Sequence, residues 1–271
     1  MPAKSRTYQP HKVSAALTAQ SEAVRDVVHR LTDSDLDRPT RLGSWRVREL
    51  VTHLSLALSQ LLAVLDAPEV AGPVLPLAEY AALAGTMAEF VDTATTEHVA
   101  SGFAGPAEEV AAEFDRSLDA VQIVLDKLAS VEPERRVTFL SGHPMLLADY
   151  LVTRLVETVV HAEDLAEALG LDAFPHDRQA LAAVSRMLAD ALAGQVPGGA
   201  VELRIPPYAV VQAVPGPKHT RGTPPNVVET DALTWIRLAT GRAEWAAAVE
   251  TAAVSASGER SDLRAYLPVL R

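Results

Sequence analysis

Apolar side chains recur every three or four positions through most of the first 170 residues, the spacing that places them on one face of an α-helix. The clearest example is residues 44–66, for which Ser44 is a candidate N-cap. Its apolar positions are Val47, Leu50, Val51, Leu54, Leu58, Leu61, Leu62 and Leu65. By the same pattern we predict helices at 12–32, 44–66, 78–100, 106–130 and 145–169. One face of the second helix should therefore lie in the core of a helical bundle.

The pattern changes after Gly170, a residue type that suits the C-terminus of the last long helix. Beyond a linker we predict a helix at 177–193, strands at 201–205, 209–214, 226–229 and 253–256, and short helices at 231–238 and 243–249. Acidic residues exceed basic ones by 12 in residues 1–175, whereas 176–271 carry one more basic than acidic residue. This step supports a helical domain of residues 1–172 followed by a smaller α+β domain of residues 176–271.

The composition is that of a folded protein, with 48% hydrophobic and 22% charged residues. No segment approaches the length of about 18 uninterrupted apolar residues that a spanning helix needs. The N-terminal residues also lack the apolar region of a signal peptide. We therefore predict a cytoplasmic protein without a membrane span, and the net charge of −11 makes nucleic acid an improbable partner.

Cysteine is absent from the sequence, which excludes disulfides, thiolate-ligated metal sites and a cysteine nucleophile. Any thiol chemistry must therefore use a thiol supplied from outside. The phosphate-binding patterns GxxxxGK[ST] and GxGxxG are absent too, so nucleotide use is not indicated. A GxSxG nucleophile elbow is likewise missing.

The most informative polar residues are Glu157 and His161, because a spacing of four places both side chains on one helical face. Their neighbours are apolar, so the pair should lie near the bundle core, where an unpaired carboxylate is costly. His53 lies at the edge of the apolar face of its helix and can point between helices. Two imidazoles and a carboxylate leave a fourth position open on zinc. The pattern thus indicates a metal site, with ligands drawn from facing helices.

Simpler interpretations stay open on spacing alone. His53 can be a hydrogen-bonded core histidine, and Glu157 with His161 can be an ordinary helical ion pair. Asp164, three residues after His161, can orient a ligand or be a solvated charge. Trp45 can be a core anchor, which its size favours, or a wall of the metal pocket.

The segment PTRLGSWRVRELVTHLSLAL, with Trp45 just inside the predicted helix and His53 eight residues later, resembles the metal-binding helix of the mycothiol-dependent maleylpyruvate isomerase family. That family belongs to the DinB-like group of all-α four-helix bundles. The resemblance covers about residues 11–170 and implies a divalent metal, zinc being the favoured ion, held by His53, Glu157 and His161. It also implies mycothiol as cosubstrate and an actinobacterial source.

The C-terminal part resembles a bacterial sterol-carrier-like domain, which implies an α+β layer with an apolar groove and makes lipid a candidate ligand. The motif that carries this resemblance is Thr230, Asp231, Thr234, Trp235, Leu238, Ala239, Thr240, Gly241 and Arg242. In the isomerase family the second domain contributes an arginine to the active site, and Arg221 is our candidate equivalent. Lys218, His219 and Arg221 also form a basic cluster suited to a carboxylate or phosphate. Its loop at 215–225 should face the open side of the metal site.

We therefore predict a metal-dependent enzyme that activates mycothiol, for S-transfer to a small electrophilic substrate or for its isomerisation. One alternative is a non-catalytic carrier of lipid or small molecules that uses the C-terminal groove. Another is an interaction protein that a metal stabilises. A stoichiometric metal ion at His53, Glu157 and His161 would distinguish the enzyme from the carrier, because a carrier does not need one.

Overall fold

The computed structural model describes residues 6–128, 131–132, 134–139, 142–217, 222 and 224–270. The chain divides into two compact units. The helical unit comprises Tyr8–Leu75 and Met87–Ala180, and the mixed unit comprises Met1–Thr7, Pro76–Thr86 and Leu181–Arg271. A helical first part and a smaller sheet-containing second part were predicted, and both are confirmed. The predicted boundary between residues 172 and 176 stays a proposal.

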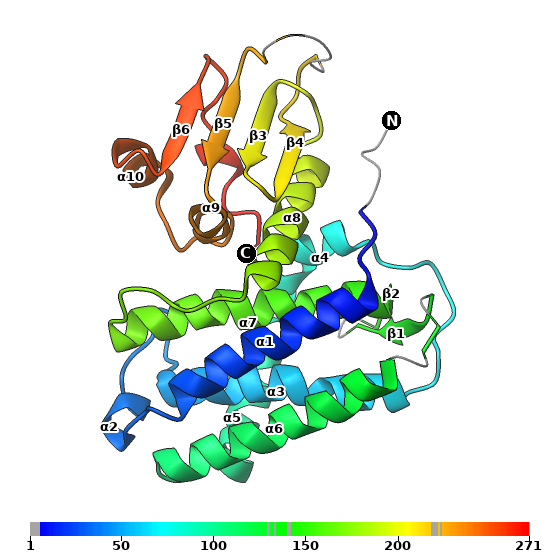
Figure 1. The fold of residues 1–271 in the computed structure, drawn as a ribbon, viewed down its shortest axis with the longest axis vertical. Helices are drawn as coiled ribbons and strands as arrows, with labels where there is room; N and C mark the ends of the chain where they lie inside the picture. The colour runs from blue at the N-terminus through cyan, green and yellow to red at the C-terminus, as the bar shows by residue number, and fades with distance from the viewer. Residues whose placement is uncertain are drawn as a thin grey trace. The chain divides into compact units, whose positions relative to one another are not determined.

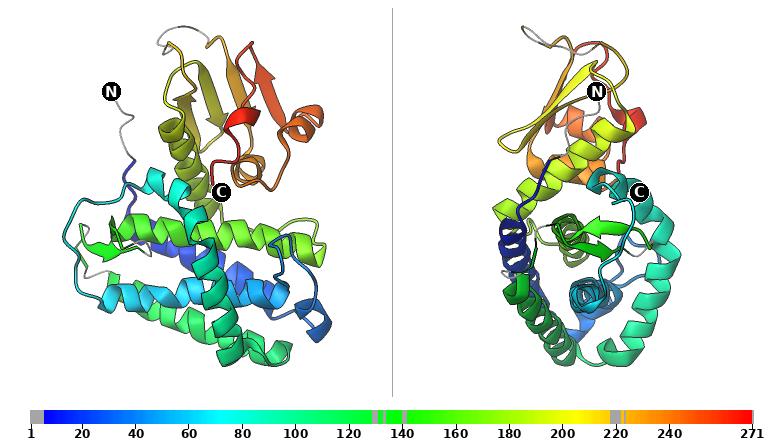
Figure 2. Two further views of the ribbon diagram at one scale, coloured as in Figure 1. Left: turned by 180° about the vertical axis from the view of Figure 1, so that it is seen from behind. Right: turned by 90° about the vertical axis from the view of Figure 1, so that its right-hand side faces the viewer.

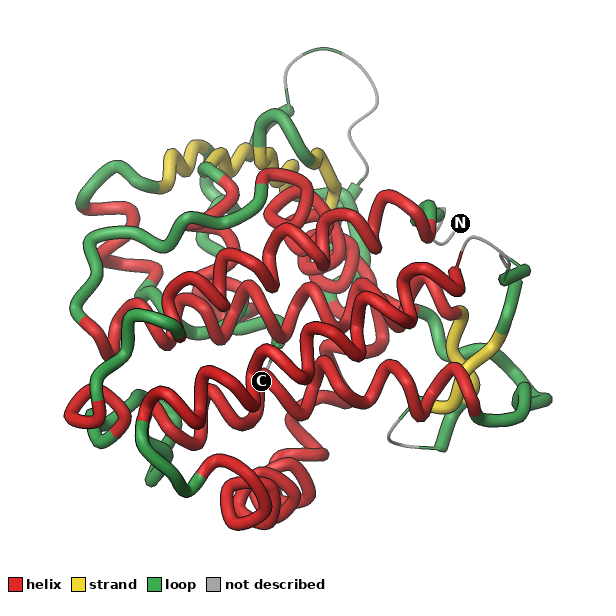
Figure 3. Tube along the Cα trace, turned by 60° about the horizontal axis from the view of Figure 1, so that its bottom comes forward, coloured by secondary structure: helices red, strands yellow, loops and turns green. Residues whose placement is uncertain are grey.

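Four long helices form the body of the helical unit (Figure 1). They are α1 (Pro10–Val28), α3 (Val47–Asp66), α6 (Ala107–Leu128) and α7 (Leu147–Leu169). Helix α3 packs against α6 and α7, and α1 packs against the same two helices. Figure 3 shows how far helix predominates in this part of the chain. The packing leaves α3 and α7 as direct neighbours, which is what positions the candidate site.

Helix α3 forms as its apolar periodicity predicts, since Leu50, Leu54 and Leu61 are completely buried. The predicted N-cap is wrong, however, because the helix begins at Val47 and not beside Ser44. The backbone N–H of Trp45 instead donates to the carbonyl of Leu42, which makes a turn there. The side chain of Glu49 accepts a hydrogen bond from the backbone of Arg46 at 2.9 Å and so caps the first turn.

The helix predicted at 78–100 is interrupted. The structure has α4 (Leu77–Ala84), a 3₁₀ turn (Gly85–Met87), α5 (Ala88–His98) and a π-helical turn (Val99–Phe103) in this region. Gly85 follows α4 directly, and glycine is a poor residue within a helix. The helix predicted at 12–32 also ends early, and α2 (Asp33–Leu36) follows it as a separate turn capped by Thr32. Apolar periodicity therefore located these helices and missed their breaks.

A short hairpin precedes α7 and was not predicted. Strands β1 (Arg136–Thr138) and β2 (Pro144–Leu146) pair antiparallel, with Arg136 opposite Leu146. Helix α7 then ends at Leu169, and its C-cap is Gly170, whose φ of 69° is the left-handed conformation that favours glycine. The predicted C-cap is thus confirmed, and the long helix from residue 145 is shortened only by the hairpin.

Among the described residues, one helix, Val47–Asp66, is long and apolar enough to cross a membrane. Length and composition alone identify it, and half of its most apolar stretch is buried inside the structure. This helix is α3, which packs against α6 and α7.

The mixed unit contains a four-stranded sheet in the order β4-β3-β5-β6 (Figures 1 and 2). Its strands are β3 (Val201–Ile205), β4 (Ala209–Ala213), β5 (Val227–Thr230) and β6 (Val254–Ser257). Strand β3 pairs antiparallel with β4 and parallel with β5, and β5 pairs antiparallel with β6. Alternate residues of β3 are buried, so one face of the sheet lies on the core. All four strands were predicted to within about one residue.

Three helices accompany the sheet: α8 (Arg178–Gln195), α9 (Ala232–Ala239) and α10 (Trp245–Glu250). Trp235 is 1% exposed, and its indole N–H donates to the carbonyl of Ser185 on α8. Asp231 caps α9 by accepting hydrogen bonds from the backbone of Leu233 and Thr234. The motif behind the sterol-carrier resemblance is therefore structural, since these members build a helix cap and a core.

Candidate metal centre

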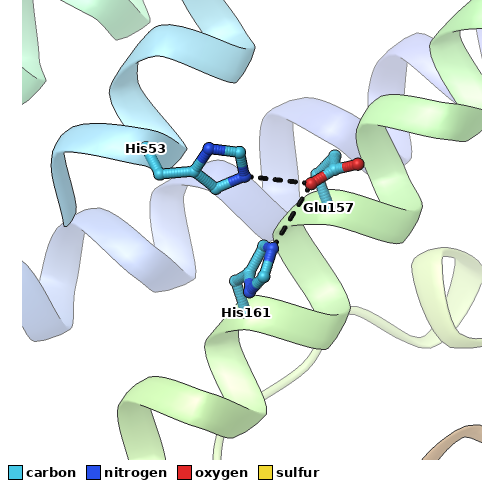
Figure 4. Close-up of side chains that lie close together, drawn as sticks. All are labelled: His53, Glu157 and His161. Carbon is cyan, nitrogen blue, oxygen red and sulfur yellow. Dashed lines mark hydrogen bonds and ion pairs between the residues drawn. The ribbon is translucent and has the colours of Figure 1, made fainter. Parts of the chain in front are cut away.

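His53, Glu157 and His161 meet at one point in the helical unit (Figure 4). His53 comes from α3, and Glu157 and His161 come from successive turns of α7. Each offers one ligand atom, and these atoms lie within 4.8 Å of one another. The Nε2 atoms of His53 and His161 lie 3.1 Å and 3.4 Å from the same oxygen, Oε2 of Glu157. The structure thus brings together the three side chains that the sequence predicts as metal ligands, and their role as ligands stays a proposal.

Burial differs little among the three side chains, which are 9%, 19% and 15% exposed for His53, Glu157 and His161. The helix spacing of four aligns Glu157 with His161, and the packing of α3 against α7 brings in His53. All three side chains are therefore mostly buried, and Glu157 and His161 are the more exposed. Such burial strengthens electrostatic interactions among the three side chains.

The orientation of His161 is set from behind by Asp164. Nδ1 of His161 lies 2.8 Å from Oδ2 of Asp164, whose side chain is fully buried. A ring that donates through Nδ1 presents the lone pair of Nε2 to the site when it is neutral. Burial lowers the pKa of His161, but hydrogen bonds to Asp164 and Glu157 outweigh it, so that the pKa is raised.

The pKa of His53 is lowered, because burial outweighs the hydrogen bond to Glu157. Its imidazole is therefore neutral at physiological pH. Its second nitrogen, Nδ1, is buried without a hydrogen-bond partner among the described residues. The pKa of Glu157 is lowered too, but for a different reason. Burial raises the pKa of this carboxyl, and hydrogen bonds from His161 and His53 outweigh burial and lower it well below the usual value.

Arg154 is a buried arginine near the site, three residues before Glu157 and only 3% exposed. Its positive charge helps to lower the pKa values of Glu157 and His53. Its guanidinium carbon lies 5.0 Å from the centre of the ring of Tyr150, one turn earlier on α7, and this cation–π contact helps to hold the side chain in place. Arg154 thus helps to keep the carboxyl of Glu157 ionised, and an ionised carboxylate at the centre of the site favours a cation.

The donor set fits a divalent metal. Two donors that each lie about 2.0–2.1 Å from a tetrahedral zinc ion are separated by about 3.4 Å. The separations of 3.1 Å and 3.4 Å from Glu157 are close to this value. The buried carboxylate behind His161 also matches the carboxylate–histidine arrangement that orients metal ligands in proteins. Lone pairs that face one another across so short a gap need a proton or a metal ion between them.

Trp45 flanks the site on the side of His53. Its ring lies 5.3 Å from the ring of His53, and its indole N–H donates to Asp92 of α5 at 2.6 Å. The sequence placed Trp45 just inside the helix, but in the structure Trp45 precedes α3. It is partly exposed, so it forms one wall of the site and is not a deeply buried core anchor.

Some residues predicted for the site cannot be placed, and some residues near it were not predicted. Arg221, Lys218 and His219 lie outside the described residues, as does the predicted approach of their loop to the site. Sequence reasoning missed Arg154 as a buried charge and Arg41, which lies beside Asp164. The side chain of His176 is also buried, with its Nε2 2.7 Å from Oε1 of Glu163. Only the tertiary packing could reveal these contacts.

Comparison with protein families decides where the chain belongs. The profile described as the mycothiol maleylpyruvate isomerase N-terminal domain matches residues 17–166, more than half of the chain. The chain belongs to this family. A second profile, described as a bacterial SCP ortholog, matches residues 177–269. Both resemblances drawn from the sequence are therefore confirmed, and the candidate metal centre lies within the part that the isomerase family covers.

Solved structures similar to this member of the family include the crystal structure of the mycothiol-dependent maleylpyruvate isomerase. That structure aligns with a TM-score of 0.62 at 16% sequence identity and covers 94% of each chain. A mutant of the isomerase in which a histidine is replaced by alanine aligns with a TM-score of 0.60, also at 16% identity and 94% coverage of each chain. No curated protein matched the sequence significantly. The structural likeness thus extends over both units and concerns the fold.

Proposed function

We propose that the protein is a metal-dependent enzyme that uses mycothiol to isomerise a small electrophilic substrate or that joins mycothiol to it through the thiol sulfur. The observation that carries the proposal is the convergence of His53, Glu157 and His161 on one point within 4.8 Å. Membership of the mycothiol maleylpyruvate isomerase family supports mycothiol as the cosubstrate. Zinc is our candidate ion, because two imidazoles and one carboxylate are a ligand set of catalytic zinc sites.

A divalent metal held here would supply Lewis acidity that lowers the pKa of a bound thiol. Glu157 stays ionised and His53 stays neutral at physiological pH, so both can bind a cation without losing a proton first. Asp164 holds Nδ1 of His161 and so aims Nε2 at the site. The ring of Trp45 lies 5.3 Å from that of His53 and flanks the site on this side.

The charge balance suits a thiolate. Among a divalent ion and its three protein ligands, the single carboxylate of Glu157 would leave one positive charge. One monoanion, such as a thiolate, neutralises that charge. The sequence contains no cysteine, so the thiol must come from a second molecule.

Several finer assignments belong to the same proposal. The helices α1, α3, α6 and α7 would constitute the DinB-like four-helix bundle of a domain at residues 1–172, followed by the sterol-carrier-like domain at 176–271. Arg221 would be the catalytic residue that orients the charged substrate, because an arginine fork suits a carboxylate. The family's chemistry is consistent with a cytoplasmic location, where a low-molecular-weight thiol stays reduced.

The test follows both the substrate and free mycothiol during incubation with maleylpyruvate or a model electrophile. Isomerisation by addition, rotation and elimination returns the thiol, whereas S-transfer consumes it. We expect turnover by metal-loaded protein and a loss of turnover after a chelator removes the metal. The variant Glu157→Ala should be inactive, and His29→Ala, which alters an exposed histidine, should behave like wild type.

A protein that binds no metal and turns over no substrate, yet takes up lipid, would be a carrier instead. The family membership does not favour that function, and nothing in the described residues points to a lipid. Turnover by metal-free protein, or turnover when no thiol is added, would also refute the proposal.

A further inference from the structure

The loop between α2 and α3 touches the candidate metal centre from outside. Both the backbone N–H and the hydroxyl of Thr40 donate to the carbonyl of Trp45, at 3.0 Å and 2.7 Å. The hydroxyl of Thr40 also accepts from the backbone of Leu42, and Gly43 adopts a φ of 62° that favours glycine. Because these bonds close the loop on itself, the intervening residue Arg41 is held in a defined place.

Arg41 reaches the carboxylate behind His161. Its Nε lies 3.9 Å from Oδ1 of Asp164, and its Nη1 donates to Glu167 at 3.2 Å. The other oxygen of Asp164 is the one that lies 2.8 Å from Nδ1 of His161. The side chain of Asp164 is fully buried, whereas that of Arg41 is 30% exposed. A line of polar contacts thus runs from the ligand His161 through Asp164 to a surface arginine.

A fully buried carboxylate is costly unless neighbouring groups compensate its charge. Arg41 supplies a positive charge to the oxygen that His161 does not use. Without that charge, the carboxylate of Asp164 is held less firmly, and the ring of His161 loses part of the support that fixes its orientation. Outer partners of this kind contribute to metal affinity although they do not touch the ion.

We propose that Arg41 is a positioning residue of the candidate metal centre, which acts through Asp164 to hold Nε2 of His161 toward Glu157. The inference rests on the proposed function only in that the site binds a metal. It assigns to the loop before α3 a role in building the site. A measurement of metal binding can test this role without mycothiol or a substrate.

The test is a double-mutant cycle on metal affinity, measured by competition between full-length protein and a chromophoric chelator for zinc or cobalt at one fixed pH. We expect Asp164→Asn to weaken binding about 10- to 100-fold, as loss of an outer carboxylate does. Arg41→Ala should weaken binding several-fold. Because Arg41 acts through Asp164, the double variant should bind no more weakly than Asp164→Asn alone, to within about twofold.

Two further variants separate the charge of Arg41 from its bulk. Arg41→Lys keeps a positive charge beside Asp164 and should restore most of the affinity. Arg41→Gln keeps a hydrogen-bond donor without a charge and should lose affinity as Arg41→Ala does. Wild-type affinity in Arg41→Gln would overturn the inference. Far-UV circular dichroism compares the folding of all variants before titration.

Arg38→Ala is the matched control, because Arg38 donates to the carbonyl of Leu169 at the end of α7 without a contact to Asp164. It should bind metal as wild type does. Additive losses in the double variant, or an equal loss in Arg38→Ala, would overturn the role of Arg41 while leaving the proposed function intact. A wild-type protein that binds no metal would instead overturn the proposed function together with the inference.

Discussion

Nε2 of His53 lies 3.1 Å from Oε2 of Glu157, although 104 positions separate the two residues in the sequence. The contact joins α3 to α7, and it exists because the apolar faces of these helices pack together. The pKa of the imidazole is lowered and that of the carboxyl is lowered well below its usual value. A neutral donor and an ionised donor thus face each other, as a cation site requires.

Removing either partner should abolish metal binding. We expect about one metal ion per wild-type chain after reconstitution, and affinities lowered by more than about 100-fold in His53→Ala and Glu157→Ala, because a lost ligand weakens binding more than a lost outer partner. Elemental analysis after gel filtration measures the ratio. His29→Ala is the control, and metal retained in both site variants would contradict the assignment of ligands.

Trp45 should report on the metal. Its ring lies 5.3 Å from that of His53, so a paramagnetic ion bound at His53 should quench its fluorescence. We expect cobalt to lower the emission in a saturable way and Trp45→Phe to remove this change. Trp235→Phe, in the mixed unit, should retain it. An identical cobalt response in Trp45→Phe would show that the ion binds elsewhere.

Asp149 should make stability depend on pH. Burial raises its pKa from 3.8 to about 6, so the folded protein binds this proton more tightly than the unfolded chain does. Its stabilising contribution is full below pH 3.8 and is lost as the pH rises through about 6. Asp149→Asn should therefore raise the free energy of unfolding above pH 6, by about 3 kcal/mol at most.

Urea unfolding at several pH values measures this effect. The difference between Asp149→Asn and wild type should shrink as the pH falls toward 3.8. Asp119→Asn on α6 is the control, since Asp119 is exposed. A stabilisation that is the same at every pH would mean that the charge of Asp149 is not its cause.

Arg221→Ala should lower turnover and leave the metal content unchanged, because the proposed role of Arg221 is to orient a charged substrate and not to bind the ion. A loss of about 10²-fold in kcat/KM corresponds to one lost charge-assisted contact of roughly 3 kcal/mol. Steady-state kinetics and elemental analysis on the same preparation separate the two effects. Arg264→Ala, which alters an exposed arginine, is the control and should have the kcat/KM of wild type. A wild-type kcat/KM in Arg221→Ala would mean that Arg221 has no part in the reaction.

The sequence sufficed for the elements in which burial follows a regular period. Leu50, Leu54 and Leu61 mark the buried face of α3, and Val201, Leu203 and Ile205 mark that of β3. The spacing of Glu157 and His161 likewise fixed their shared helical face before the fold was known. His53 could be paired with them through the family resemblance, because periodicity alone left it at the edge of its apolar face.

Other features depend on tertiary contacts and left no periodic signal. The hairpin of β1 and β2 is too short to show alternation, and the break at Gly85 lies within an apolar stretch. Arg41 reaches Asp164 only because a closed loop lies beside the end of α7. A surface-like arginine in a polar segment gives no sign of that contact.

The central claim is that a metal held by His53, Glu157 and His161 activates a thiol from outside the protein. The most direct measurement is the absorption spectrum of cobalt-substituted protein before and after addition of mycothiol. Because the chain contains no cysteine, a sulfur-to-cobalt charge-transfer band can arise only from the added thiol. We predict that the band appears, saturates at one mycothiol per cobalt, and is absent in Glu157→Ala. A cobalt-loaded protein whose spectrum mycothiol leaves unchanged would contradict the account.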